Sequence, residues 1–155
     1  MQGMGRPVVV LDFGAQYSKL IARRVREANV YSLIVPYNAP LDDLRALNPA
    51  GIIFSGGPAS VHAPGAPMPD PGVFDMGIPI LGICYGVQLF AHMLGGKVER
   101  SDRREYGIAH LENSDTSGFL DGIDPRTQVW MSHGDAISIM PPGFEVIGRT
   151  ENCPY

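Results

Sequence analysis

A cysteine between two glycines is the stretch of this sequence whose residue types could do chemistry. Cys84 lies in Gly82-Ile83-Cys84-Tyr85-Gly86, a G-x-C-x-G pattern with the spacing of the G-x-S-x-G nucleophile elbow. In such an elbow the central residue sits in a strained turn from strand to helix, and the glycines let neighbouring backbone approach closely. The pattern therefore predicts that Cys84 is a nucleophile that projects from the end of a sheet.

The flanking sequence fits a strand that runs straight into a helix. Residues 78–83 are a short apolar run, and residues 87–94 repeat apolar side chains at helical spacing until Gly95-Gly96. A helix that begins at Cys84 favours an anion there, which predicts a lowered pKa for the thiol. The backbone N–H of Tyr85 is then the first oxyanion donor. The alternative is a buried apolar cysteine whose glycines serve packing.

A glycine pair follows the strand expected at residues 51–54. Ser55-Gly56-Gly57-Pro58 places exposed backbone N–H groups at the carboxyl edge of the sheet, where ligands bind in open α/β folds. We expect Gly57 to supply a second oxyanion donor that faces Cys84. The alternative is a plain turn.

Strand and helix patterns alternate in the first two thirds of the chain. This order predicts an α/β fold, a flavodoxin-like open parallel sheet with helices on both faces. The C-terminal third predicts antiparallel strands, with residues 130–135 as a polar turn. The strands are expected at 8–11, 31–35, 51–54, 78–83, 97–99, 107–111, 128–131, 136–139 and 145–149, and the helices at 17–29, 41–47 and 87–94.

The first predicted helix carries a cluster of arginines. Arg23, Arg24 and Arg26, with Glu27, are expected to form a solvated face. A phosphate site is the alternative, although no glycine-rich cradle accompanies it. Ser18 is expected to cap the helix.

Composition limits the classes of function. A chain of 155 residues can bury a sizeable core, and a net charge of −4 with scattered arginines argues against nucleic acid or a membrane surface as the main partner. The apolar runs are strand-sized, and the N-terminal stretch lacks the apolar core of a signal peptide. Two cysteines without a secretory signal indicate a reducing cytoplasm. No metal-binding cluster with proper ligand spacing is visible.

Cysteine hydrolases need a base, usually histidine, within reach of the thiol. The chain offers His62, His92, His110 and His133. We expect His62 to face solvent and His110 to lie on a strand, and His92 lies about 12 Å along its helix from Cys84. His133, beside Gly134-Asp135, is the one placed like a site residue. It is expected to shape a substrate or domain-contact loop, and a role as the base is the alternative.

Five stretches of the sequence form a recognisable set of motifs, at residues 10–17, 21–27, 55–58, 82–88 and 130–135. Together they resemble a known family, the class I glutamine amidotransferase domain, and the resemblance spans essentially the whole chain. The D-F-G-A-Q-Y start and the W-M-S-H-G-D stretch point to the GMP synthase branch of that family.

The resemblance implies a glutaminase that cleaves the side-chain amide of glutamine through a thioester on Cys84 and releases ammonia. Gly57 and Tyr85 would form the oxyanion hole, and Gln88 would hold the α-amino-acid end of the substrate. The residues that would line the glutamine pocket or contact a synthetase domain are Ser132, His133, Gly134 and Asp135.

The resemblance also implies a partner. Ammonia would pass to an ATP-pyrophosphatase domain or subunit, where it displaces AMP from adenylated XMP to give GMP. ATP and magnesium would bind in that domain, and no cofactor is expected in this one. The complete enzyme could be a homodimer.

The family's base and orienting acid lie in a His-Pro-Glu segment, which the 155 residues do not contain. Residues 1–155 are therefore expected to form a single, incomplete amidotransferase domain that is inactive by itself. Two other functions remain open. One is a catalytically inactive module that binds glutamine or regulates a partner, and the other is a different flavodoxin-like cysteine hydrolase with His133 as its base.

Overall fold

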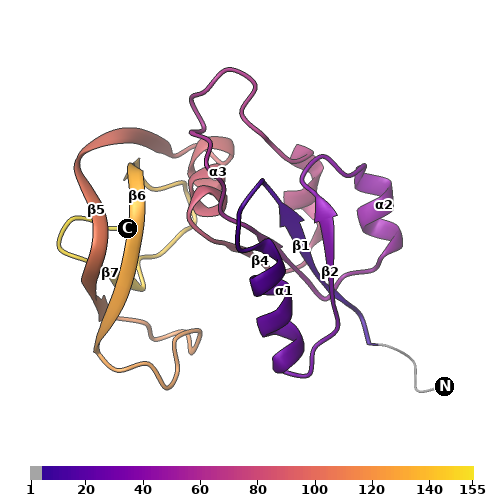
Figure 1. Cartoon of the computed structure of the whole chain (residues 1–155), viewed down its shortest axis with the longest axis horizontal. Coiled ribbons are helices and arrows are strands. Elements are labelled where there is room, and N and C mark those ends of the chain that lie inside the picture. The colour runs from indigo at the N-terminus through magenta and orange to yellow at the C-terminus, as the bar shows by residue number, and fades with distance from the viewer. Residues whose placement is uncertain (1–4) are drawn as a thin grey trace. The chain divides into compact units, whose positions relative to one another are not determined.

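The computed structural model describes the backbone of residues 5–155 and the side chains of all of these except residues 101–105. The chain forms two compact units, Met1–Met93 and Leu94–Tyr155 (Figure 1). None of the helices in the described part of the chain combines the length and the apolar character that crossing a bilayer requires.

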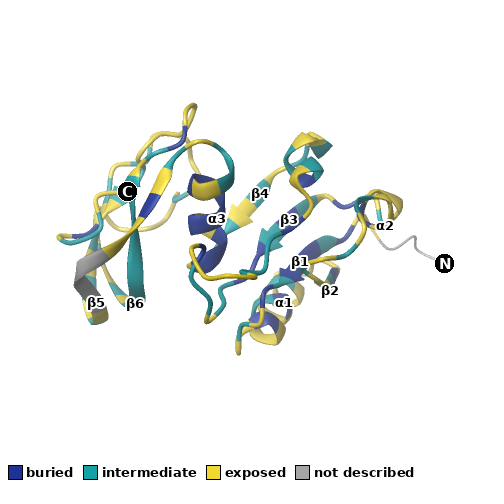
Figure 2. Cartoon of the chain, turned by 90° about the horizontal axis from the view of Figure 1, so that it is seen from above, coloured by how far each residue is buried: buried dark blue, intermediate teal, exposed yellow. Residues whose placement is uncertain are grey.

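The first unit is a parallel sheet of four strands in the order β2-β1-β3-β4 (Figure 2). Val9, Val10 and Leu11 of β1 are fully buried, as expected for a central strand covered on both faces. The predicted α/β fold with a parallel sheet is confirmed. In chain order the elements are β1 (Val8–Asp12), α1 (Ser18–Glu27), β2 (Ser32–Pro36), α2 (Leu41–Ala46), β3 (Gly51–Phe54), the 3-10 helix η1 (Pro71–Met76), β4 (Ile80–Gly82) and α3 (Tyr85–Met93).

The strand order sets where the helices lie. The chain passes from β1 to β2, which lies on one side of β1. It then passes through α2 to β3, which lies on the other side of β1. Because crossovers between parallel strands are right-handed, these opposite movements place α1 and α2 on opposite faces of the sheet. Figure 2 shows the resulting burial, which concentrates on the middle of the sheet and on the part of α3 that packs against it.

Aromatic rings fill the core beneath the carboxyl ends of the strands. Phe13 at the end of β1 lies 5.4 Å, centroid to centroid, from Phe54 at the end of β3, and 5.7 Å from Tyr85 at the start of α3. Phe54 lies 5.4 Å from Phe90 on the same helix. Tilted ring pairs at these distances pack favourably beyond their buried area. They fix the ends of β1 and β3 relative to the start of α3.

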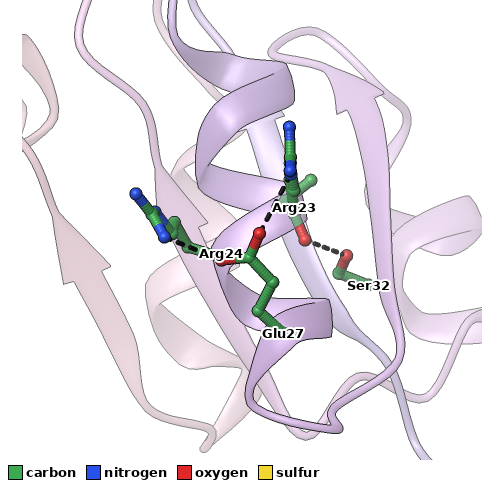
Figure 3. Close-up of polar contacts among 5 residues, drawn as sticks. Arg23, Arg24, Glu27 and Ser32 are labelled. Carbon is green, nitrogen blue, oxygen red and sulfur yellow. Dashed lines mark hydrogen bonds and ion pairs between the residues drawn. The ribbon is translucent and has the colours of Figure 1, made fainter.

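The arginines of α1 make structural contacts (Figure 3). Glu27 accepts from Arg23 at 2.9 Å and from Arg24 at 2.8 Å, and these three side chains are largely exposed. Arg26 donates to the backbone carbonyl of Ser32 at 2.9 Å. These contacts account for the arginines as the solvated face of the helix, and exposed pairs of this kind add little stability.

Two buried serines attach α1 to the sheet. The hydroxyl of Ser32 on β2 donates to the carbonyl of Ala22 at 2.9 Å (Figure 3). Ser18 donates to Oδ1 of Asp12 at 2.7 Å and is the first residue of the helix, whereas Tyr17 occupies the cap position. The prediction that Ser18 caps α1 is therefore wrong, because its hydroxyl faces the end of β1 instead of the helix N–H groups.

The second unit is an antiparallel sheet in the order β6-β5-β7, formed by β5 (Lys97–Asn113), β6 (Arg126–Ile139) and β7 (Gly148–Arg149). The antiparallel pairing was predicted, but the expected short strands at 97–99 and 107–111 merge into β5. Those at 128–131 and 136–139 merge into β6. Register shifts between Lys97 and Val98 and between Arg100 and Glu105 let so long a ribbon bend.

Residues 130–135, expected to form a turn, lie inside β6. Trp130 pairs with Ile108, and Ser132 pairs with Tyr106. The prediction of a turn is wrong. A partly exposed strand carries polar residues on its solvent-facing positions, and such a stretch has a composition similar to that of a turn. The last expected strand, at 145–149, shortens to β7.

Leu89 provides a test of the core described for the first unit. Its side chain on α3 is fully buried, whereas Leu20 on α1 is 45% exposed. Leu89→Ala should lower the free energy of unfolding by about 2–5 kcal/mol, because it removes buried surface and leaves a cavity. The matched control Leu20→Ala should change it by less than about 1 kcal/mol. Urea denaturation followed by circular dichroism measures both, and equal losses would contradict this packing of α3.

Candidate functional site

Cys84 occupies a strained turn between β4 and α3. Its φ is +51°, a left-handed backbone conformation that residues other than glycine rarely adopt. The strand ends at Gly82 and the helix begins at Tyr85, so two residues make the whole turn. Cys84 is exposed. The predicted elbow is confirmed, and strain at such a position is typical of functional sites.

The two glycines of the elbow have no room for a side chain. A Cβ at Gly82 would lie 2.7 Å from the backbone nitrogen of Val87. A Cβ at Gly86 would lie 2.5 Å from the carbonyl oxygen of Phe54, which belongs to β3. The glycines at positions two before and two after Cys84 therefore let α3 approach β4 and β3 at backbone distance.

The glycine pair after β3 lies beside the cysteine. A Cβ at Gly56 would stand 3.5 Å from the Cβ of Cys84, and one at Gly57 would stand 2.6 Å from the carbonyl oxygen of Phe13. The hydroxyl of Ser55 accepts from the N–H of Phe13 at 3.0 Å and donates to the carbonyl of Gly56 at 2.8 Å. The loops after β1 and β3 are thus held together next to the elbow.

Backbone N–H groups suited to an oxyanion are present in this region. In the part of the chain that the structure describes, the N–H groups of Gly57 and Tyr85 donate no hydrogen bond. The next N–H groups of α3 have acceptors within the elbow, because Gly86 donates to the carbonyl of Ile83 at 2.9 Å, and Val87 and Gln88 donate to the carbonyl of Cys84 at 3.0 and 3.2 Å. The assignment of Gly57 and Tyr85 to an oxyanion hole stays a prediction that this arrangement supports.

The side chain of Tyr85 has a structural role that the sequence analysis missed. Its ring is buried, and its hydroxyl donates to the carbonyl oxygen of Pro67 at 2.7 Å. Burial raises the pKa of Tyr85, and the nearby Tyr37 raises it further, so the phenol remains protonated and can donate. Tyr85 therefore ties the proline-rich loop to the start of α3.

The remaining predicted site residues divide between the units. Gln88 is buried on α3, one helical turn after Cys84. Ser132-His133-Gly134-Asp135 lies on β6 in the second unit, where Nδ1 of His133 stands 3.2 Å from the carbonyl oxygen of Asp135. The substrate-binding roles of these residues stay predictions.

The pKa of Cys84 departs from its ordinary value in the direction opposite to that expected. The thiol directly precedes α3, where the helix N-terminus favours the thiolate. Although the residue is exposed, protein around the sulfur replaces part of its water, and this burial raises the pKa of Cys84. The predicted lowering is therefore wrong, because the loss of water around the sulfur disfavours the thiolate. The thiol form dominates at neutral pH, so attack requires a base.

No group of three or more His, Cys, Asp or Glu side chains that could hold a metal ion occurs among the described residues.

The sequence is similar to a large family. The model of the family described as glutamine amidotransferase class-I matches residues 9–154. A relative from Aquifex aeolicus, named GMP synthase [glutamine-hydrolyzing], is 53% identical over 97% of this chain and 29% of its own length. A relative of the same name from Thermomicrobium roseum is 54% identical over 96% of this chain and 28% of its own length. The chain thus spans less than a third of the curated relatives that it matches.

Solved structures are similar as well. A protein of Thermoplasma acidophilum, described as a GMP synthase subunit, matches with a TM-score of 0.82 and 27% identity, over 99% of this chain and 77% of that one. A glutamine amidotransferase of Thermotoga maritima matches with a TM-score of 0.72 over 95% of this chain and 69% of that one. At 22% identity, the second likeness shows the fold alone.

Gly86→Ala tests the close approach of α3 to β3. In an ordinary helix this change would stabilise by about 1 kcal/mol. Here the added Cβ would meet the carbonyl oxygen of Phe54, so we expect a net loss of about 1–3 kcal/mol in the free energy of unfolding. Gly5→Ala, whose Cβ would meet nothing within 4 Å, is the control and should leave stability nearly unchanged. Chemical denaturation decides, and a stabilised Gly86→Ala variant would refute the contact.

The raised pKa of Cys84 predicts how its alkylation depends on pH. The thiolate is the reactive form, so the alkylation rate of Cys84 should rise about tenfold per pH unit while the pH is below the pKa. The rate should reach half its maximum at a pH above the ordinary pKa of a cysteine thiol. Mass spectrometry of iodoacetamide-treated protein follows Cys84 and Cys153 separately, and Cys84→Ser identifies the signal. A half-maximal rate for Cys84 below about pH 8 would show that the helix, not burial, dominates.

Proposed function

The chain belongs to the glutamine amidotransferase class-I family, and on that premise we propose that its first unit supplies the nucleophile and oxyanion hole of a glutaminase. The observation that carries the proposal is the backbone of Cys84, with φ at +51° between two glycines that cannot accept a side chain. A packing cysteine needs no left-handed turn, whereas a nucleophile does, because the turn directs its sulfur away from the sheet.

The proposed reaction has three steps, which are attack by Cys84, release of ammonia and hydrolysis of a thioester. The sulfur of Cys84, as thiolate, bonds to the carbonyl carbon of the glutamine side-chain amide, and the carbonyl electrons move to oxygen. The N–H groups of Gly57 and Tyr85 would donate to that oxyanion. Collapse of the intermediate breaks the carbon–nitrogen bond, and the amide nitrogen takes the proton that the base removed from the thiol and leaves as ammonia. Water then attacks the glutamyl thioester and releases glutamate, which restores the thiol.

The proton transfers need a base because the thiol of Cys84 is protonated at neutral pH. We assign the base and its orienting carboxylate to a His-Pro-Glu segment, as the resemblance implies, and the 155 residues contain no such segment. Gln88, one turn along α3 from Cys84, would hold the α-amino and α-carboxyl groups of glutamine. Residues 132–135 would line the glutamine pocket or contact a synthetase.

The names of the relatives suggest which reaction consumes the ammonia. We propose that it passes to an ATP-pyrophosphatase part of a longer cytoplasmic ligase, which converts adenylated XMP to GMP and could assemble as a homodimer. ATP and magnesium would act in that part.

Replacement of Cys84 is the direct test. In the longer protein with its His-Pro-Glu segment, Cys84→Ala should lower glutamine-dependent release of glutamate and ammonia by about a thousandfold or more, because no other group forms the thioester. GMP formation from added ammonia should persist. Cys153→Ala is the matched control and should retain glutaminase activity. Hydrolysis that survives Cys84→Ala would overturn the proposal.

A second variant locates the base. His133→Ala should retain part of the turnover if the base lies in the His-Pro-Glu segment. Loss of all turnover with unchanged glutamine binding would instead identify His133 as the base and contradict our assignment. If the unaltered longer protein binds glutamine and never hydrolyses it, the chain is a binding module.

A further inference from the structure

Two histidines from separate segments of the first unit have neighbouring rings. His62 lies in the loop after β3, and His92 lies in the last turn of α3. Their ring centroids are 6.0 Å apart and their planes cross at 88°. Both residues are exposed. The glutaminase reaction assigns no role to either of them.

The separation of the rings is close to that of two ligands on one metal ion. Metal–nitrogen bonds of about 2.0–2.1 Å put the ring centroids of two imidazoles on a tetrahedral ion roughly 5 Å apart. The observed 6.0 Å between His62 and His92 therefore needs a shift of about 1 Å, which small torsional changes of exposed side chains supply. An edge-to-face contact of two imidazoles without an ion is the competing account.

The surroundings of the pair favour a cation. His92 stands at the carboxyl end of α3, where the last carbonyl groups of a helix carry partial negative charge. The loop that carries His62 has two local backbone hydrogen bonds: Ala63 donates to the carbonyl of Ser60 at 3.0 Å, which encloses His62, and Ala66 donates to the carbonyl of Ala63 at 3.0 Å. A loop held in this way loses less freedom when a ligand binds.

We propose that His62 and His92 form a two-imidazole site for a borderline transition-metal cation such as Zn²⁺, Ni²⁺ or Cu²⁺, with water completing the coordination. Imidazole nitrogen suits these ions, whereas Mg²⁺ and Ca²⁺ prefer oxygen. A bound ion would join the loop after β3 to the helix that follows Cys84. The hydroxyl of Tyr85 already holds the same loop at Pro67.

Calorimetric titration with Zn²⁺ alone tests the site. The 155-residue chain carries Cys84→Ser and Cys153→Ser, because thiols are softer and stronger zinc ligands. We expect one ion per chain. His62→Ala and His92→Ala should each lower the affinity about tenfold or more, since one imidazole cannot chelate. His110→Ala, an exposed histidine of the second unit, is the matched control and should leave the affinity unchanged.

Nuclear magnetic resonance with Cu²⁺ provides a second readout that does not depend on variants. The ion should broaden the imidazole proton signals of His62 and His92 before those of His110 and His133, and thermal melts without metal verify that each variant is folded. The proposal fails if both single variants bind zinc as well as their parent does. It also fails if His110→Ala weakens binding equally, or if copper broadens all four histidines alike.

Discussion

The close approach of α3 to the sheet is the constraint on which the rest of the structure depends. The start of α3 lies against the carbonyl of Phe54 on β3 and against the end of β4, in both places at backbone distance. Only glycine at positions 82 and 86 leaves room for these contacts. A helix that starts so close to its own strand leaves two residues for the turn, and Cys84 must then adopt a positive φ. Strain at the cysteine is thus the consequence of packing around it, and the aromatic rings of Phe54, Phe90 and Tyr85 hold that packing in place.

The same constraint shapes the electrostatics of the site. Within the described structure, the N–H of Tyr85 stays free because the helix begins directly after the cysteine, and the loop after β3 stays close because Gly57 packs on the carbonyl of Phe13. Both features favour a negative charge on a substrate oxygen. The surrounding protein also removes water from the sulfur and raises the pKa of Cys84. In the proposed reaction this arrangement would stabilise an oxyanion while it keeps the resting thiol protonated, so that attack on the substrate requires a base.

Local patterns in the sequence predicted the parts of the structure that local chemistry determines. Apolar periodicity located the parallel strands, and strand β3 was predicted at its observed bounds. Glycine spacing, together with a strand pattern that passes directly into a helix pattern, located the elbow. The direction of the pKa change at Cys84 could not be predicted, because the loss of water around its sulfur depends on the folded surroundings. The hydrogen bond from Tyr85 to Pro67 was missed for a similar reason, since it joins segments distant in sequence. A polar stretch such as 130–135 reads as a turn until its pairing partner is known.

The finding that this polar stretch is a strand also sharpens the roles proposed for it. Successive side chains of a strand point to opposite faces, so Ser132 and His133 cannot serve one pocket from one face of the ribbon. His133 and Asp135 share a face, are half-buried, and contact each other through Nδ1 and a carbonyl oxygen at 3.2 Å. Ser132 is exposed beside Trp130, Ile108 and Tyr106, whose exposed fractions are 74%, 62% and 64%. The alternation therefore divides the predicted set, because His133 and Asp135 can act together on one face of the ribbon while Ser132 lies on the face of Trp130.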